Sequence, residues 1–451
     1  MNKKECQILV IGGGIAGVAI AEIFSRSGHK TILIEDKDKL CIEASGSHHG
    51  WFHFGSLYSI FPSNQFMRTL IGGIEDLIEF YSSFRGMNLF ITKKGKLDFN
   101  DSKDSWIRDE PIDYLVAARN NEDFNLLKSS NIFSFFKKLI FRLTWEFAIK
   151  QFISRHHRYQ NYNWNNNRAS TEIPKAGWMD YSKKFIKKPS DKDFKFNRDS
   201  HFLIEGFDRP MNPINIIKDL VKSTLANGAE IYLNCRYKSY KKVTENKYEV
   251  LTNSNTILAQ KIIFASGKEL GLHTMNKSNI SVVASPLLVV YPAISNKHIV
   301  RLTPFVDKTI NHISHEINGI KYSVIGGGYA SPLEDKNKII ECCTKLENIA
   351  REFFKGINSN SFLKTYVGYK TELIASQGER NYQYIIKNIE DNVFSVLPGK
   401  FSLCFSTAVN CYRTVFGKEP KKVSDYDSKI NVDQYTSIMQ HAKIVLSSLE
   451  K

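Results

Sequence analysis

The sequence holds one glycine-rich turn whose residue types and spacing suit the binding of a phosphate. Gly12-Gly13-Gly14-Ile15-Ala16-Gly17 fits the pattern G-x-G-x-x-G. In this pattern the first glycine permits a tight turn, the second lets a pyrophosphate approach the backbone, and the third lets a helix pack closely on a strand. The turn therefore predicts a dinucleotide site, with contacts from Gly12, Gly14, Ile15, Ala16 and Gly17.

Two strands and a helix must position this turn. Residues 7–11 form a short apolar run that is typical of a buried parallel strand. A helix is predicted from the turn to about Ser27, with Gly28 as a left-handed cap and residues 31–34 as the next strand. Glu35 ends that strand. Its carboxylate can accept both hydrogen bonds of an adenosine ribose diol and would repel a 2′-phosphate, which disfavours NADP. The turn alone does not distinguish FAD from NAD.

A second segment with possible chemistry follows at residues 46–58. It is punctuated by glycines and places His53 between Gly50 and Gly55. An imidazole can take a hydroxyl or ammonium proton near neutral pH, so His53 is a candidate general base. The alternative is that the ring only packs in the interior.

Five residues of this segment carry a resemblance to a known family. They match the run G-x-x-x-G-x-x-H-x-G-x-x-Y, and they are Gly46, Gly50, His53, Gly55 and Tyr58. The run is similar to one beneath the isoalloxazine ring in the D-amino-acid oxidase-like (DAO) family of FAD-dependent oxidoreductases, nearest to its glycerol-3-phosphate and L-2-hydroxyglutarate dehydrogenase branches. The resemblance implies FAD as cofactor and His53 as a base or flavin-orienting group. Further flavin contacts are expected at Ser45, Gly46, Ser47 and Gly50.

Two later motifs extend the resemblance along the chain. Residues 259–267 resemble the A-x-x-h-I-x-A-x-G signature (h is apolar) that returns the chain to the flavin domain, which implies a contact at Gly267. Residues 393–402 precede a small-residue helix, where relatives place a helix N-terminus under the flavin pyrimidine. Gly399, Lys400 and Phe401 are the expected contacts there. Lys400 could bring its ammonium near the N1–C2 edge of the ring, or it could lie in solvent.

A cation for the substrate is expected from residues 366–372. They lie where relatives carry a G-x-R-P-like segment whose arginine often holds a substrate anion, and Lys370 takes that place. Lysine is a point charge without the planar fork of arginine, which weakens the expectation of carboxylate recognition. Arg380 and Tyr382 follow and could complete an anion site, or form an ordinary surface turn. The candidate catalytic residues are therefore His53, Lys370 and Arg380.

The motif order implies an α/β fold, with an FAD/NAD(P)-binding Rossmann-like domain and an inserted α+β substrate domain. The FAD-binding domain is expected at 1–85, 205–275 and 366–451, and the substrate or cap domain at 86–204 and 276–365. Helices are predicted at 63–84, at 212–227 after Pro213, and at 331–354. Strands are predicted at 229–233 and, for the substrate domain, at 286–331. Helical periodicity also extends from Trp106 to about Lys150.

One stretch of that periodicity is amphipathic. Apolar side chains recur at helical spacing, with basic ones on or beside the opposite face: the first set is Ile132, Phe136, Leu139, Leu143 and Phe147, and the second is Lys137, Lys138, Arg142, Lys150 and Arg155. The pattern indicates a helix packed on the substrate domain or a helix in contact with a membrane surface.

Composition sets the broad class. The 451 residues, 42% of them hydrophobic, indicate a globular protein with a sizeable core. The net charge of +16 would attract nucleic acid, anionic lipid or acidic substrates, or it reflects a compositional bias of the source. Seven cysteines without a C-x-x-C pair indicate a reducing compartment. With no apolar signal region and no long apolar window, we expect a cytoplasmic location, with peripheral membrane contact as an alternative. His156-His157 has no further ligand at metal spacing, so no metal is predicted.

The resemblance implies an FAD-dependent oxidoreductase, a dehydrogenase or oxidase that passes hydride to flavin N5 from a C–H bond beside an alcohol or amine. Its expected partners are a small polar substrate and an electron acceptor whose identity stays open; no DNA is expected. One alternative is a flavoenzyme that acts on a sugar nucleotide or tRNA without net oxidation and uses the positive charge to bind it. Another is a peripheral membrane dehydrogenase that feeds quinone.

Overall fold

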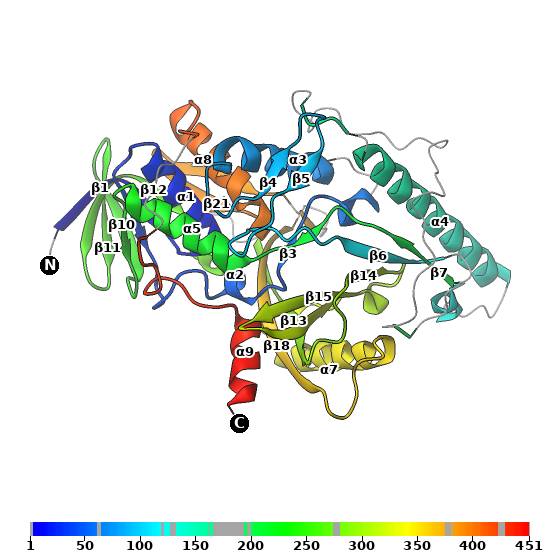
Figure 1. Cartoon of the computed structure of the whole chain (residues 1–451). Helices are drawn as coiled ribbons and strands as arrows, with labels where there is room; N and C mark the ends of the chain where they lie inside the picture. Colours follow the sequence, from blue (N-terminus) through cyan, green and yellow to red (C-terminus); the bar gives the residue numbers. More distant parts are fainter. Residues whose placement is uncertain are drawn as a thin grey trace.

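The computed structural model of the chain describes residues 3–60, 65–118, 121–126, 132–160, 162–165, 194–195, 200–273, 280–374, 380–381, 383–422 and 429–450. They form two large sheets, one on the side of the N-terminus and one beside α7 (Figure 1). Helix α4 lies on the side of the molecule away from the N-terminus (Figure 1). Tyr382 lies outside the described residues.

The first sheet has eight strands in the order β10-β11-β12-β1-β2-β9, with β21 beside β12 and β20 beside β21. β1 pairs in parallel with both β2 and β12, and residues 8–11 of β1 are buried, which confirms the predicted parallel strand. The strands are β1 (Lys3–Ile11), β2 (Thr31–Ile34), β9 (Glu230–Tyr232), β10 (Tyr237–Thr244), β11 (Lys247–Thr252), β12 (Thr256–Phe264), β20 (Ile385–Glu390) and β21 (Val393–Leu397).

Helices α1 (Ile15–Arg26), α3 (Gln65–Tyr81), α5 (Pro213–Ala226) and α8 (Cys404–Phe416) share one apolar core with this sheet. Gly28 has a φ of +91° just after α1, as the predicted left-handed cap requires. A buried ion pair joins Arg26 Nε to Glu22 Oε1 at 2.9 Å. Arg26 also donates to the carbonyl oxygen of Phe80 in α3, so the C-terminal ends of α1 and α3 are tied together.

The second sheet has nine strands in the order β19-β18-β13-β16-β15-β14-β6-β7, with β17 beside β13. These are β6 (Ile112–Ala117), β7 (His201–Ile204), β13 (Ile280–Tyr291), β14 (His298–Leu302), β15 (Ile310–Ile317), β16 (Ile320–Gly327), β17 (Ser331–Pro332), β18 (Phe362–Ile374) and β19 (Arg380–Asn381). Leu288 of β13 packs under α7 (Lys336–Phe353), whereas its neighbour Leu287 packs under α9 (Gln440–Leu449). Because successive side chains of a strand alternate, these two helices lie on opposite faces of the sheet.

Shorter elements link the two sheets. The two-stranded ribbon of β3 (Trp51–Phe52) and β8 (Arg209–Pro210) joins residues 46–58, the histidine segment, to the start of α5. In a second ribbon, β4 (Leu89–Ile91) pairs with β5 (Leu97–Phe99). α2 (Ala44–Ser47), α6 (Leu270–His273) and the 3₁₀ turns η1 (Leu57–Ile60), η2 (Glu122–Leu126), η5 (Gly267–Glu269), η7 (Val306–Lys308) and η8 (Phe401–Leu403) complete the described elements.

The helical periodicity predicted from Trp106 to Lys150 is wrong in its first part. Residues 112–117 form β6, which pairs with β14 and β7. This strand is covered on both faces, so its apolar run lacks the alternation of a half-exposed strand. Helix α4 (Ile132–Gln160) begins later than predicted and continues past Lys150, packing on β6 through Ile149, Phe152 and Ile153.

Sheet membership bears on the predicted domains at one boundary. β18 runs across residue 366 and pairs with β13 along its length, so residues 366–374 belong to the second sheet. The division into an FAD-binding and a substrate domain otherwise stays a prediction. The mixed α/β architecture with a Rossmann-like sheet is confirmed.

Candidate active site

The glycine turn joins β1 to α1, and its three motif glycines meet different neighbours. Gly12 has a φ of +108°, and a Cβ there would lie 2.7 Å from the carbonyl oxygen of Ala265. A Cβ at Gly17 would lie 1.9 Å from the carbonyl oxygen of Gly12, so helix and strand touch through these two glycines. At Gly14, by contrast, the nearest described atom to an added Cβ is Ser45 Oγ, 3.6 Å away. Gly14 therefore borders the open space that a pyrophosphate needs.

Glu35 follows β2 and turns back towards this loop. Its Oε2 accepts a hydrogen bond from the backbone N–H of Gly13 at 2.5 Å, and its Oε1 accepts one from Lys37 at 2.9 Å. Burial raises the pKa of the Glu35 carboxyl, although both N–H groups oppose the shift. The carboxylate thus lies beside the turn, where a ribose contact requires it, and its bond to a ribose diol stays a prediction. Ser45 Oγ accepts from the N–H of Ile15 at 3.0 Å and ties α2 to the start of α1.

The segments assigned to the flavin contain buried polar atoms without a hydrogen-bond partner in the part of the chain that the structure describes. The rings of His48 and Phe401 meet edge to face at 4.8 Å, so the histidine segment contacts the start of η8. The unsatisfied buried atoms in these segments are Ser47 Oγ, His48 Nε2, His49 Nε2, Ser266 Oγ and Ser402 Oγ. Buried polar groups normally have partners, and the phosphates, hydroxyls and ring carbonyls of FAD would supply them. The residues therefore fit FAD.

Asp208 anchors the loop that carries His53. Its fully buried carboxylate accepts the backbone N–H groups of four successive residues, 54–57, at 2.7 to 3.4 Å. It also accepts from the hydroxyl of Tyr114 at 2.6 Å. Burial by itself would raise the pKa of Asp208, but the nearby imidazole and these donors together leave it below its ordinary value. Asp208 could not be found from the sequence, because an aspartate between Phe207 and an Arg-Pro pair has no distinctive pattern.

His53 lies between this carboxylate and a lysine. Its Nδ1 is 3.8 Å from Asp208 Oδ2, which is longer than a hydrogen bond. The ring of Tyr58 lies 5.5 Å from the ring of His53, and Lys400 Nζ lies 4.7 Å from the centroid of Tyr58. Burial lowers the pKa of His53 to about 4, with the charges of Lys400 and Lys370 acting in the same direction and Asp208 opposing them. The imidazole is therefore neutral at physiological pH.

Of the two predicted substrate cations, the structure describes Lys370 with its side chain and Arg380 only by its backbone. Lys370 lies on β18, exposed, with Nζ 3.4 Å from Ser285 Oγ. Its charge contributes to the lowered pKa of both His49 and His53, after burial. Arg380 belongs to β19 and pairs with Ile374 in the β18 ladder, whereas its side chain lies outside the described part of the chain. The structure thus brings Lys370 and Lys400 to the side of His53, and the roles of all three stay predictions.

A chain of buried histidines reaches this site from the second sheet. His315 Nε2 lies 3.0 Å from the carbonyl oxygen of His49, and the rings of His315 and His441 lie 4.6 Å apart. His441, on α9, is hydrogen-bonded to the hydroxyl of Tyr322 at 2.7 Å. Burial lowers the pKa of His441 to about 3, so this ring is neutral. The sequence did not reveal this connection, because its members are more than a hundred residues apart.

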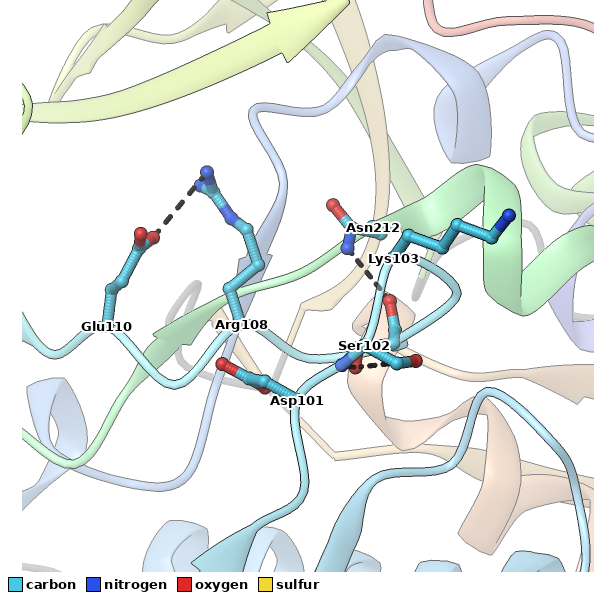
Figure 2. A pocket seen from close by; sticks show the side chains of 7 residues that line it. Asp101, Ser102, Lys103, Arg108, Glu110 and Asn212 are labelled. Carbon is cyan, nitrogen blue, oxygen red and sulfur yellow. Dashed lines mark hydrogen bonds and ion pairs between the residues drawn. The ribbon is translucent and has the colours of Figure 1, made fainter.

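A separate hollow with a volume of about 400 Å³ lies on the surface beside β15 (Figure 2). Arg108 Nη1 lies 3.6 Å from Glu110 Oε2, and the side chain of Asn212 donates to the carbonyl oxygen of Ser105 at 2.8 Å. The lining contains two basic and two acidic residues, so its charges balance; it consists of Asp101, Ser102, Lys103, Ser105, Arg108, Glu110 and Asn212. None of the predicted site residues lines it.

The described residues form neither a metal site nor a membrane-spanning helix. They contain no group of three or more histidine, cysteine or acidic residues arranged to hold a metal ion. Nor does any helix among them combine the length and apolarity that crossing a membrane requires. The cytoplasmic location stays a prediction.

Comparison with known proteins gives a family match over part of the chain. Residues 7–131 match the family model "DAO: FAD dependent oxidoreductase". No curated protein matches the sequence significantly.

Solved structures resemble the chain over nearly its whole length. The L-alpha-glycerophosphate oxidase of Mycoplasma pneumoniae is 16% identical, with a TM-score of 0.61 over 95% of this chain and 99% of that one. The L-proline dehydrogenase of P. horikoshii is 13% identical, with a TM-score of 0.55 and coverage of 93% and 96%. The glycine oxidase of Geobacillus kaustophilus is 11% identical, with a TM-score of 0.55 and coverage of 96% and 98%. At such identities the likeness shows the fold.

Proposed function

Because residues 7–131 place this chain in the DAO family of FAD-dependent oxidoreductases, we propose that it oxidises a C–H bond beside an alcohol or amine of a small polar substrate. The chain is a flavoenzyme, and its cofactor is FAD. When bound, FAD supplies the hydride acceptor, N5 of its ring. Holding the substrate and taking up its proton are the tasks of the protein side chains.

The arrangement of His53 and Asp208 supports this proposal most directly. Nδ1 of His53 faces the carboxylate at 3.8 Å, which favours the tautomer that carries its proton on Nδ1. Nε2 is then the acceptor. Because the pKa of His53 is about 4, the imidazole is neutral at physiological pH and can take a proton from a substrate hydroxyl or ammonium.

Lys370 is proposed to bind an anionic group of the substrate. Its positive charge is one of the factors that lower the pKa of His53, behind burial and Lys400. A substrate carboxylate or phosphate beside Lys370 would offset that charge and raise the pKa of His53 towards neutrality. The base would therefore become stronger when an anionic substrate binds, with the gain limited by solvent because Lys370 is exposed.

The test is anaerobic reduction of the bound flavin. The FAD-loaded protein is mixed with hydroxy acids, amines, amino acids, sugar derivatives and glycerol phosphates, and the loss of oxidised-flavin absorbance is followed. Proline, glycine and glycerophosphate belong in the panel because three proteins with a similar fold are named as enzymes that act on these compounds. A compound with a C–H bond beside OH or NH₂ should bleach the flavin, and its analogue without that group should not. Reduction by NADH alone would contradict the proposal.

Action on a sugar nucleotide or tRNA stays a prediction from charge alone. The net charge of +16 is its only support. Salt-sensitive binding of such a polyanion, without flavin reduction by any member of the panel, would favour it.

A further inference from the structure

One peptide group lies between two imidazoles that are far apart in the sequence. It is the group that joins His49 to Gly50. Its carbonyl oxygen, on His49, lies 3.0 Å from Nε2 of His315, which belongs to β15 of the second sheet. Its N–H, on Gly50, donates to Nδ1 of His48 at 2.9 Å. A single peptide group therefore connects the rings of His315 and His48.

These contacts fix where each ring carries its hydrogen. Burial lowers the pKa of His48 to about 3 and holds the pKa of His315 well below its ordinary value. Both rings are therefore neutral at physiological pH, and each has a single N–H. A carbonyl oxygen can only accept, so His315 carries its hydrogen on Nε2. Nδ1 of His48 accepts from the backbone, so the hydrogen of His48 is on Nε2 as well.

Gly50 is the residue that lets the second imidazole come so close. It has a φ of +76°, in the left-handed region, and a Cβ there would lie 2.7 Å from Cε1 of His315. Its own carbonyl oxygen accepts from the N–H of Met211, the residue after β8, at 2.8 Å. The backbone at residues 49 and 50 is thus held from the second sheet and from the β8 side, which fixes the direction of the N–H that meets His48.

Nε2 of His48 is a buried donor with no hydrogen-bond partner among the described residues. The ring lies between two segments that are assigned to the flavin. It follows Ser47, the last residue of α2, and it meets the ring of Phe401, at the start of η8, edge to face at 4.8 Å. A buried N–H normally has an acceptor, and FAD carries acceptors in its phosphates, its hydroxyls and the carbonyls of its ring.

We propose that His48 donates a hydrogen bond from Nε2 to the bound FAD, and that His315 is the positioning residue that keeps this donor in place through the peptide group of residues 49 and 50. None of the expected flavin contacts lies on β15, so the second sheet acts on the cofactor only indirectly here. The inference rests on FAD as the cofactor and not on the proposed substrate reaction, and its test uses no substrate.

The first test is titration of the apoprotein with FAD, followed by the flavin absorbance and fluorescence. His48→Phe removes the N–H but keeps a ring against Phe401, so FAD affinity should fall about tenfold, the order expected for one buried hydrogen bond. His48→Gln can accept from Gly50 with its oxygen and donate with its nitrogen, so it should lose less than about threefold. Unchanged affinity in His48→Phe, or equal losses in both variants, would overturn the proposal.

The second test asks whether His315 acts through His48. His315→Phe removes the donor to the carbonyl oxygen of His49 and should weaken FAD binding by about threefold or more. In a protein that already carries His48→Phe, the same change should cause little further loss, because the donor that it positions is gone. His315→Gln keeps an N–H for the carbonyl and should restore most of the affinity. Losses that multiply in the double variant would refute the positioning role.

His312→Gln is the matched control. His312 is buried on the same strand, but its partners are the carbonyl oxygen of Lys297 and the hydroxyl of Ser323, so FAD affinity should equal that of the wild type. A reduced affinity in this control as large as that of His315→Phe would mean that any buried histidine of β15 has the same effect, which contradicts the proposal. Thermal unfolding of each apoprotein checks that it is folded.

A measurement on the wild type does not depend on how the variants fold. Histidine ¹⁵N shifts of the FAD-loaded protein distinguish a neutral ring with its hydrogen on Nε2 from one with its hydrogen on Nδ1. The signals of His48 are assigned by their loss in His48→Gln. We expect the Nε2–H form for His48, and the Nδ1–H form would show that the proposal is wrong.

Discussion

Oδ2 of Asp208 lies 3.8 Å from Nδ1 of His53, while the same carboxylate accepts the N–H groups of the four residues that follow His53. One buried side chain therefore sets both the path of the loop and the orientation of the imidazole. Tyr114, from β6 of the second sheet, donates to it as well, so Asp208 joins the two halves of the site. Its removal should affect stability and chemistry together.

We expect Asp208→Asn to lower the free energy of unfolding by about 2–5 kcal/mol, because a neutral amide accepts the buried donors less well and turns its own NH₂ towards some of them. Flavin reduction should slow in addition. Urea unfolding measures the first effect and stopped-flow absorbance the second. The control is Asp109→Asn at a more exposed carboxylate, 3.5 Å from Arg209 Nε, which should change stability by less than about 1 kcal/mol. Equal effects of the two variants would refute the anchoring role.

His53→Ala should keep FAD bound but slow its reduction by substrate about 10² to 10⁴-fold, the usual range for loss of a positioned acid–base group. Rapid-mixing absorbance gives the rate, and the flavin spectrum gives the occupancy. His29→Ala is the control, because His29 stacks on Phe416 outside the site. An unchanged rate in His53→Ala would mean that this imidazole is structural.

Gly14→Val should give a folded protein without FAD. The added side chain points into the open space beside Ser45 Oγ, 3.6 Å away, so the apoprotein should lose little stability. The same side chain would occupy the space that the pyrophosphate needs. Gly17→Ala should instead destabilise the apoprotein itself, because its Cβ would lie 1.9 Å from the carbonyl oxygen of Gly12. Apoprotein thermal unfolding and FAD titration separate the two outcomes. Normal FAD affinity in Gly14→Val would exclude this turn as the pyrophosphate site.

Lys400→Met should lower the midpoint potential of the flavin by tens of millivolts, if the ammonium beside Tyr58 stabilises the negative charge of the reduced ring. Such a shift corresponds to roughly 1 kcal/mol or more for a two-electron couple. Lys418→Met is the matched control, since Lys418 also lies over an aromatic ring, that of Phe416, outside the site. A potential that matches the wild type within error would place Lys400 away from the ring.

Stability should fall in mild acid. Burial lowers the pKa of His53 and His156 to about 4, and of His312 and His441 to about 3. In the unfolded chain the pKa of these histidines is near 6.5. Between pH 6.5 and about pH 4 the unfolded chain therefore binds more protons than the folded one. Stability is therefore present above pH 6.5 and lost as pH falls through this window.

The measurement is urea unfolding from pH 7.5 to 4.5. The free energy of unfolding should decrease steadily as the pH falls. In His312→Gln its dependence on pH should be shallower, because about one proton fewer is taken up on unfolding. His312 is suited to this because its partners, the carbonyl of Lys297 and the hydroxyl of Ser323, can also bond to an amide. A flat profile would mean that the histidines can be protonated in the folded state.

Local patterns in the sequence were sufficient for the strand, turn and helix at the start of the chain. The strand, turn and helix at residues 3–26 follow from a short apolar run, three glycines and helical spacing, all within thirty residues. The α5 helix after Pro213 and the return strand β12 are equally local. The helix predicted over residues 112–117 is wrong, because these residues form a strand that is covered on both faces. Such a strand has the same continuous apolar run as a buried helix.

The sequence by itself determined the glycine turn, the buried parallel strands and the position of His53 within a glycine-rich segment, because each depends on residues close together in the chain. Only the tertiary structure decided what surrounds that histidine. Asp208 is 155 residues away and Lys400 is 347 residues away in the sequence. In the fold, Asp208 lies 3.8 Å from His53, and the charge of Lys400 is close enough to lower the pKa of that histidine. Which face of α4 is buried was likewise decided by packing, since Ile149, Phe152 and Ile153 share a core with β6 and β7. Helical periodicity shows that a helix has an apolar face, but packing decides whether that face is the one that is buried.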